Sequence, residues 1–180
     1  MNRAARRSFL PAALGAAVLV AVSAPAAVAD SFPPGFPNGI PPQVAMLRNA
    51  NSGKCLEVAD WRTDVGAPVR QWDCHGGANQ VWNFASGIPG AFVNLNSGLC
   101  LEIADWRTDG GAPARQWTCT RGMNQSWSWS RNSPTEGWMI TNNNSVKVLE
   151  IAAWDTANGV NATQWASNGG NNQRWETIER

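Results

Sequence analysis

Residues 51–82 read NSGKCLEVADWRTDVGAPVRQWDCHGGANQVW, and two further copies of this block occupy residues 96–127 and 144–175. The first copy agrees with the second at 23 of 32 positions and with the third at 16 of 32, with no gap in either alignment. A block repeated at a fixed length is the signature of a fold built from equivalent units. Polar and aromatic residues repeat together with the apolar ones. This indicates up to three related sites and favours binding over a single catalytic centre.

Each copy predicts four short strands separated by Gly-, Asn- and Ser-containing turns, and no window shows a sustained helical period. Three units of four strands can close into one barrel with a three-fold axis, which removes the exposed sheet edges, whereas a propeller needs about four or more blades. The sequence therefore predicts an all-β protein, a β-trefoil with pseudo-three-fold symmetry and repeats at 44–86, 90–131 and 137–178. The predicted strands are 44–48, 55–59, 68–72, 80–84, 92–95, 100–104, 113–117, 125–129, 138–141, 148–152, 162–165 and 173–178.

The first 29 residues predict a signal peptide. Arg3, Arg6 and Arg7 precede an apolar run over 9–22, and the small residues 27–29 form a cleavage site. Ordinary Sec export and twin-arginine export remain equally open, and the run is too short to favour a membrane span. Residues 30–43 hold five prolines and predict an extended leader that either docks or is a free tail. We therefore expect a secreted protein with one domain over 44–180.

The amino-acid composition narrows the range of binding partners that the protein can have. Removing the three signal arginines leaves 11 basic and 13 acidic residues in the mature chain, so no basic stripe is available for nucleic acid. His75 is the only histidine, and no cluster of His and Cys suggests a metal site or a catalytic triad. We expect no cofactor and no enzymatic activity. The chain has eleven Trp and no Tyr, which is more indole than a core of this size needs.

The four cysteines fall in the first two copies at the same two columns. The third copy has Val148 and Ser167 there, and the joint loss of both cysteines is what a bonded pair predicts. Of the three possible connectivities, the repeat selects bonds within copies, Cys55 to Cys74 and Cys100 to Cys119. Each would contribute about 3 kcal/mol in the chain-entropy model.

The chain resembles the ricin B-type lectin family, a class of carbohydrate-binding modules. The resemblance rests on Asn-Gln-x-Trp at 79–82, 124–127 and 172–175, on a Gln-Trp pair before each, and on the Cys-Leu-Glu type strand that opens each copy. It implies a β-trefoil with one shallow sugar pocket per repeat. In that family the pocket uses an acid two residues after the first Cys, an aromatic residue two before the second Cys, and the Asn of Asn-Gln-x-Trp.

Carried over by position, the resemblance predicts three sets of carbohydrate-binding residues. The acid is usually Asp in the family but Glu in all copies here, so Asp60 and Asp105 are candidates for its polar contacts. Three tryptophans in the loop after the acid either wall the pocket or cover the barrel. The predicted carbohydrate-binding residues are Glu57, Asp60, Trp61, Trp72 and Asn79; Glu102, Asp105, Trp106, Trp117 and Asn124; and Glu150, Trp154, Trp165 and Asn172.

For some repeated residues a structural role is the stronger interpretation. These residues are Gln80, Trp82, Gln125, Trp127, Gln173 and Trp175. For Asn79, Asn124 and Asn172, turn capping and ligand contact are equally strong interpretations. Because the third copy loses the loop aspartates and the strand arginine, we expect its pocket to contribute less than the first two.

The sequence predicts a lectin first, and a trefoil that binds a protein or inhibits a protease second. It predicts neither the sugar nor the oligomeric state.

Overall fold

The computed structural model describes residues 43–133 and 135–179. The predicted signal peptide, and the predicted leader apart from Gln43, lie outside these residues. The described part contains strands and short 3-10 helices, and no α-helix. Its strands are β1 (Val44–Asn49), β2 (Cys55–Val58), β3 (Val69–Trp72), β4 (Val81–Asn83), β5 (Val93–Asn94), β6 (Cys100–Ile103), β7 (Ala114–Trp117), β8 (Trp127–Ser130), β9 (Met139–Asn142), β10 (Val148–Ile151), β11 (Ala162–Trp165) and β12 (Trp175–Ile178).

Six strands form a ring. β1 pairs with β4 and β12, β4 with β5, and β8 with β9, all antiparallel. Two seams are closed by backbone hydrogen bonds beyond the strand ends. The N–H of Trp127 donates to the carbonyl of Gly90 over 2.9 Å, and Trp138 and Trp175 exchange two bonds of 2.7 and 2.9 Å. Closure removes the exposed edges that an open sheet would present.

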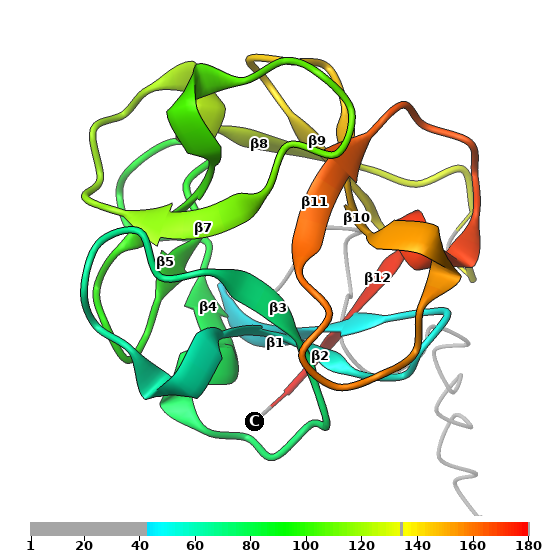
Figure 1. The fold of residues 1–180 in the computed structure, drawn as a ribbon, viewed down its shortest axis with the longest axis horizontal. Coiled ribbons are helices and arrows are strands. Elements are labelled where there is room, and N and C mark those ends of the chain that lie inside the picture. Colours follow the sequence, from blue (N-terminus) through cyan, green and yellow to red (C-terminus); the bar gives the residue numbers. More distant parts are fainter. Residues whose placement is uncertain (1–42, 134, 180) are drawn as a thin grey trace, which may run out of the picture. The chain divides into compact units, whose positions relative to one another are not determined.

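Three hairpins, β2–β3, β6–β7 and β10–β11, cover one end of this ring. Their second strands, β3, β7 and β11, surround the centre of the view in Figure 1 and are joined by isolated bridges such as Pro68 with Arg115. The three hairpins also share one register. Opposite residues are Glu57 and Arg70, Glu102 and Arg115, and Glu150 and Thr163. The predicted β-trefoil is confirmed.

The core is built from equivalent columns of the three copies. Trp82 is fully buried, and its indole Nε1 donates to the carbonyl of Leu56 over 3.1 Å. Trp127 and Trp175 make the same bond to the neighbouring hairpins of their own copies. Burying an indole while satisfying its N–H avoids the cost of an unpaired donor. These three tryptophans thus fasten each hairpin to the ring.

Buried glutamines join each copy to the next. The Gln71 side chain, on β3, accepts from Ser52 Oγ over 2.6 Å and donates to the carbonyls of Asp155 and Ala157 over 3.0 and 2.9 Å. Gln116 and Gln164 make equivalent bonds. Each glutamine therefore holds the loop that follows the site acid of a neighbouring copy.

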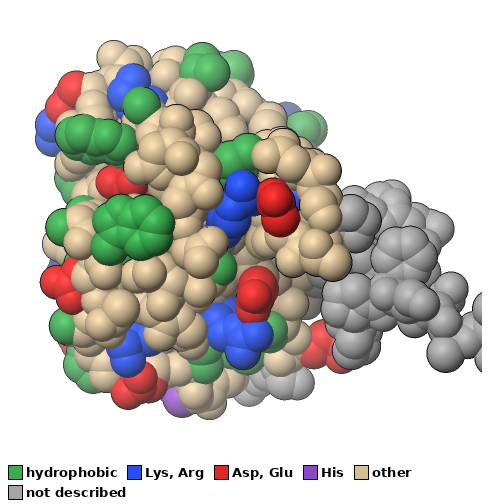
Figure 2. Space-filling view, turned by 90° about the vertical axis from the view of Figure 1, so that its right-hand side faces the viewer, with side chains coloured by type: hydrophobic (Ala, Val, Ile, Leu, Met, Phe, Trp, Pro, Cys, Tyr) green, Lys and Arg blue, Asp and Glu red, His purple; other side chains and the backbone are tan. Residues whose placement is uncertain are grey.

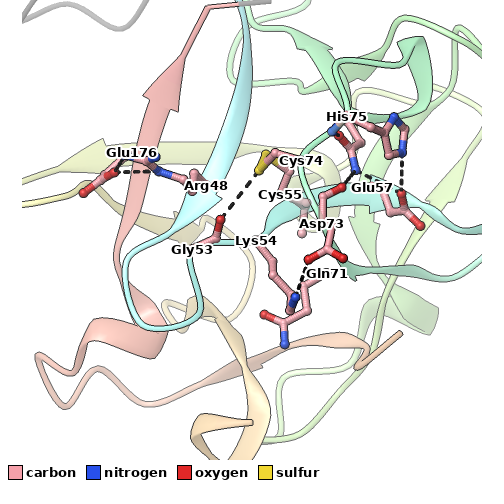
Figure 3. The surroundings of a disulfide bond; sticks show 12 residues. Arg48, Gly53, Lys54, Cys55, Glu57, Gln71, Asp73, Cys74, His75 and Glu176 are labelled. Carbon is pink, nitrogen blue, oxygen red and sulfur yellow. Dashed lines mark hydrogen bonds and ion pairs between the residues drawn. A yellow bond between two sulfur atoms is a disulfide. The ribbon is translucent and has the colours of Figure 1, made fainter. Parts of the chain in front are cut away.

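Both predicted disulfides are confirmed. Cys55 bonds Cys74 with a Cα–Cα separation of 5.0 Å, and Cys100 bonds Cys119 at 5.1 Å. Figure 3 shows the first bond with Glu57 and His75 in its surroundings. Each disulfide links the first strand of a hairpin to the segment that follows its second strand.

The predicted strand ends were too long where the chain turns into 3-10 helices. The predicted strand 55–59 ends at Val58, because Ala59–Trp61 form a 3-10 turn. The predicted strand 80–84 begins at Val81, because Ala78–Gln80 form another. Four equivalent turns occur in the other copies, at Ala104–Trp106, Met123–Gln125, Ala152–Trp154 and Asn171–Gln173. A three-residue turn carries no sequence periodicity, so the pattern could not show it.

Candidate functional site

The predicted site residues of the first copy lie together. Glu57, Asp60, Trp61, Trp72 and Asn79 all line one pocket of about 220 Å³. They come from β2, the 3-10 turn after it, β3 and the 3-10 turn before β4. The hairpin register places the strand residues side by side, and the two turns supply the rest.

Glu57 is the polar centre of this pocket. It is 2 % exposed, and its carboxylate accepts from Asn79 Nδ2 and Gln80 Nε2, each over 3.2 Å, and from Arg70 Nε over 3.0 Å. Arg70 also donates from Nη2 to Asp60 over 2.9 Å. A buried carboxylate is costly without a compensating charge, and Arg70 supplies that charge here.

Asn79 has one unused group. Its Nδ2 donates to Glu57 and, over 3.1 Å, to the carbonyl of Val58. Its Oδ1 is buried and has no hydrogen-bond partner, as is Oδ1 of Asn124 and of Asn172. An unpaired buried acceptor costs about 1–3 kcal/mol. The same cost repeated in three copies indicates that this amide is held in place for a purpose other than turn formation alone.

Trp61 forms an exposed wall of the pocket. Asp60 and Trp61 both have positive φ, 53° and 56°, a conformation that costs a non-glycine residue about 1 kcal/mol or more. Asn96 of the next copy fixes this turn by donating to the carbonyl of Trp61 over 3.1 Å. The indole lies against Gly77, where a Cβ would come within 2.5 Å of the ring. The strained turn therefore holds a half-exposed indole, 51 % exposed, over the pocket.

Trp72 is a more enclosed wall. The guanidinium carbon of Arg70 lies 4.6 Å from its ring centroid, a cation–π arrangement. The ring also lies beside the loop of the third copy, with its Cζ3 atom 3.6 Å from the position that a Cβ on Gly159 would take. The sequence predicts Trp72 as the stacking platform, and that remains a prediction. The geometry leaves Trp61 the more accessible indole.

The second copy repeats these contacts. Arg115 donates to Glu102 over 2.8 Å and to Asp105 over 3.0 Å, and it lies 4.3 Å from the Trp117 centroid. Trp106 adopts φ 57° and is half exposed. Asn124 again binds the carboxylate of its own copy. The second copy therefore repeats the carboxylate, arginine and indole contacts of the first.

The third copy assembles a different pocket from the same columns. Glu150, Trp154, Trp165 and Asn172 line a pocket of about 270 Å³ together with Thr163. Asn172 and Gln173 donate to Glu150 over 3.3 and 2.9 Å, as in the other copies. Thr163 stands where Arg70 and Arg115 stand, and Ala153 where Asp60 and Asp105 stand. This pocket therefore keeps the carboxylate and the indoles but has neither the arginine nor the loop aspartate.

His75 belongs to the first pocket only. Its ring stacks on Trp61 at a centroid distance of 5.8 Å, and its Nε2 lies 3.5 Å from the Glu57 carboxylate. Thr120 and Asn168 occupy the same column in the other copies. The sequence identified His75 only as an unsuitable catalytic residue.

Arg70 and Arg115 were also not among the predicted site residues. The signal that could have found them is the register. Strands paired in a hairpin place the residue thirteen positions after the site glutamate directly opposite it. The first Asn of each block was missed as well, because its partner is the turn of another copy.

No charge of one sign dominates the face drawn in Figure 2. Basic side chains lie beside acidic ones there, and neutral atoms cover most of the area. Ion pairs such as Arg48 with Glu176 and Lys54 with Asp73 fit this pattern. Across residues 43–133 and 135–179, no group of acidic, His and Cys side chains is arranged to hold a metal ion. No helix within those ranges is long and apolar enough to cross a membrane.

Fold and site together define a β-trefoil whose three copies each hold a buried carboxylate bound by an asparagine. A model of the ricin-type beta-trefoil lectin domain matches residues 43–175, and the chain belongs to this family. It is similar to the designed three-fold symmetric protein ThreeFoil, with 29 % identity, a TM-score of 0.73, and coverage of 77 % of this chain and 100 % of that one.

Two natural proteins with solved structures are also similar. One is an exo-beta-1,3-galactanase from Clostridium thermocellum, with 30 % identity and a TM-score of 0.71. The match covers 77 % of this chain but only 30 % of that enzyme. The other is the Rhizoctonia solani agglutinin, with 20 % identity, a TM-score of 0.69, and coverage of 81 % of this chain and 100 % of the agglutinin. At that identity the likeness shows the fold alone.

Proposed function

We propose that the protein is a secreted, non-catalytic lectin with one sugar pocket in each repeat. The observation that carries this proposal is the threefold assembly of one constellation: a buried carboxylate, the asparagine bound to it, and two indoles at the rim. A single catalytic centre has no need of three equivalent copies, whereas binding to a repeating polymer gains from them.

The chemistry of a pyranose matches this constellation. One face of the ring carries C–H groups and packs on a flat aromatic surface, and the hydroxyls need donors and acceptors in fixed positions. In the first pocket Arg70 supplies donors, and Asp60 supplies acceptors on an exposed side chain. A neutral polyol is therefore the ligand class that the first and second pockets suit.

We assign the stacking surface to Trp61 and Trp106, and the inner wall to Trp72 and Trp117. The first pair is half exposed, whereas arginine lies over each ring of the second pair. A ligand that stacked on Trp72 from that side would have to displace Arg70 from its two carboxylates.

The arrangement of acids supports a non-catalytic role. A glycosidase places two carboxylates on either side of one bond, one of them as a proton donor. In the first pocket Glu57 and Asp60 both accept hydrogen bonds from the same arginine, so both are used to position Arg70. The same holds for the second pocket.

A glycan array followed by calorimetric titration tests the proposal. We expect weak binding to monosaccharides, about millimolar to high micromolar, and much tighter binding to a polysaccharide that engages several pockets. The triple variant Trp61→Ala/Trp106→Ala/Trp154→Ala should lose binding. The control Leu95→Ala removes an apolar side chain of similar exposure outside the pockets and should bind normally.

Absence of binding to every glycan on a broad array would overturn the proposal. It would leave the second function predicted from the sequence, a trefoil that binds a protein or inhibits a protease.

A further inference from the structure

The three pocket carboxylates differ in how their charge is compensated. Glu57 and Glu102 each pair with an arginine on the opposite strand. Glu150 is equally enclosed, at 5 % exposed, but faces Thr163 at that position. Among the described residues no cationic side chain lies within ion-pair distance of Glu150, and the donors it has are the neutral amides of Asn172 and Gln173.

The neighbouring loop does not supply the missing cation. Arg107 of the second copy reaches this side of the molecule. Gln164 donates a hydrogen bond to its backbone carbonyl. Its guanidinium is occupied by Asp109, to which Nε and Nη2 both donate. Asp155, at the position of Arg62 in the first copy, adds a further negative charge to the turn after Ala153.

Removing the arginine also uncovers the inner indole. Trp165 is 48 % exposed, whereas Trp72 and Trp117 lie beneath their arginines and are less exposed. Thr163 leaves its Oγ1 buried without a hydrogen-bond partner. The third pocket thus combines an uncompensated carboxylate, a spare hydroxyl and two accessible indoles in a volume larger than that of the first.

We propose that the third pocket selects a sugar that carries a free ammonium group, that is, a 2-amino-2-deoxyhexose unit, over its neutral counterparts. The ammonium would take the place that Arg70 and Arg115 hold in the other copies and would donate to Glu150. The apolar face of the ring would lie on Trp154 or Trp165. This inference rests on the proposed lectin function and specifies the ligand class of one of its sites.

Charge explains the direction of the selectivity. An ionised donor on a carboxylate forms a hydrogen bond about twice as strong as a neutral one, and a buried carboxylate without a cation gains most from such a partner. Pockets one and two already contain their cation, so a second positive charge gains little there. We expect about a tenfold preference for the amino sugar at the third pocket, as for a single charge-assisted hydrogen bond.

The test titrates the full mature protein with glucosamine and galactosamine, each against the neutral hexose and the N-acetylated sugar. The pH is held at about 6, where a sugar amine keeps its proton. The wild type should prefer the amine. Glu150→Gln removes the charge with little change in shape, and Thr163→Arg restores the arginine of the other copies. Both variants should lose the preference, while the first two copies, which neither substitution changes, should continue to bind the neutral sugar.

Arg115→Thr is the matched reverse variant. It should create a second amine-preferring pocket and raise the stoichiometry for the amino sugar. Circular dichroism first establishes that each variant is folded. L-lysine amide is the control ligand, since it carries an ammonium group but no pyranose ring.

The outcomes separate the two proposals. If neutral sugars bind but the amine is not preferred, or if its preference survives in both Glu150→Gln and Thr163→Arg, this inference is wrong and the lectin function stands. Lysine amide binding as tightly as glucosamine would refute the sugar part of the inference. If no sugar of any kind binds, the proposed function fails and this inference fails with it.

Discussion

The first and third copies use the same columns of sequence to build two electrostatically different pockets. In the first, Arg70 joins Glu57 and Asp60 and covers Trp72. In the third, Thr163 leaves Glu150 without a cation and Trp165 uncovered. The backbone hardly distinguishes them, since the hairpin register and the strained turn are identical. Symmetry of the fold therefore does not imply symmetry of the sites, because one strand position decides whether the carboxylate is already neutralised.

The largest expected effect comes from giving the third copy the disulfide it lacks. Val148 lies opposite Trp165 as Cys55 lies opposite Trp72, and Ser167 follows at the column of Cys74. Val148→Cys/Ser167→Cys should form a bond within the copy and raise the free energy of unfolding by about 3 kcal/mol, because it closes a loop of similar length. Urea unfolding with and without reductant measures this. A variant that stays unbonded under oxidising conditions would show that the third hairpin is not equivalent in side-chain geometry.

Tryptophan truncations should separate the pockets by which indole each one uses. Trp61→Ala and Trp106→Ala should each cost about 1–3 kcal/mol at their own site, by analogy with stacking on nucleobases. Trp72→Ala should cost less, since Arg70 lies over that ring. Titration with a neutral oligosaccharide measures each.

The inner indole should matter more in the third pocket than in the first. With no arginine over it, Trp165 should matter more to its own pocket than Trp72 does to the first. For neutral ligands we still expect the first two pockets to dominate total binding. If Trp165→Ala alone abolished binding of the neutral sugar, that ranking of the pockets would be wrong.

A smaller effect concerns the turn that opens each copy. Gly53 and Gly98 have φ of 70° and 71°, and the third copy places Val146 there, at φ 59° and 78 % exposed. A β-branched residue pays about 1–2 kcal/mol in this conformation, and glycine costs about 0.5–1 kcal/mol of chain entropy. Val146→Gly should therefore stabilise the protein by about 0.5–1 kcal/mol in urea unfolding. Gly98→Val is the matched reverse and should destabilise it similarly; a stabilising Gly98→Val would contradict the strain argument.

The smallest expected effect is a pH dependence that arises from Asp73, which has no acidic counterpart in the other copies. Hydrogen bonds from Lys54 and then from Asn158 lower the pKa of Asp73 below its ordinary value of 3.8. A lowered pKa means that the unfolded state binds the proton more readily. The stabilisation is therefore complete above that ordinary value and is lost as the pH falls through the lowered pKa.

Asp73→Asn should lower the melting temperature slightly near neutral pH, and the difference from the wild type should shrink as the pH falls below the ordinary pKa of the carboxyl group. Thr118 and Ala166 occupy this column in the other copies. A difference of equal size that persists at acid pH would indicate lost packing rather than lost ionisation.

Much of the fold was predictable because its signals are local and repeated. Cysteines present in two copies and jointly absent from the third identified the disulfides, and strand–turn patterns in three in-phase blocks identified the trefoil. The 3-10 turns at 59–61 and 78–80 were not predictable, because turns this short carry no periodicity. In the first of them, positive φ at Asp60 and Trp61 accompanies contacts such as the bond from Asn96. That contact joins residues from different copies.

The sequence by itself determined the architecture, because a repeated pattern admits few ways of closing twelve strands. Only the tertiary structure decided how the polar and aromatic residues of the three copies pair. Arg70 compensates Glu57, the loop of the third copy backs Trp72, and the first Asn of each block fixes the turn of another. These pairings depend on register and on contacts between copies, and they determine the charge that each pocket presents to a ligand.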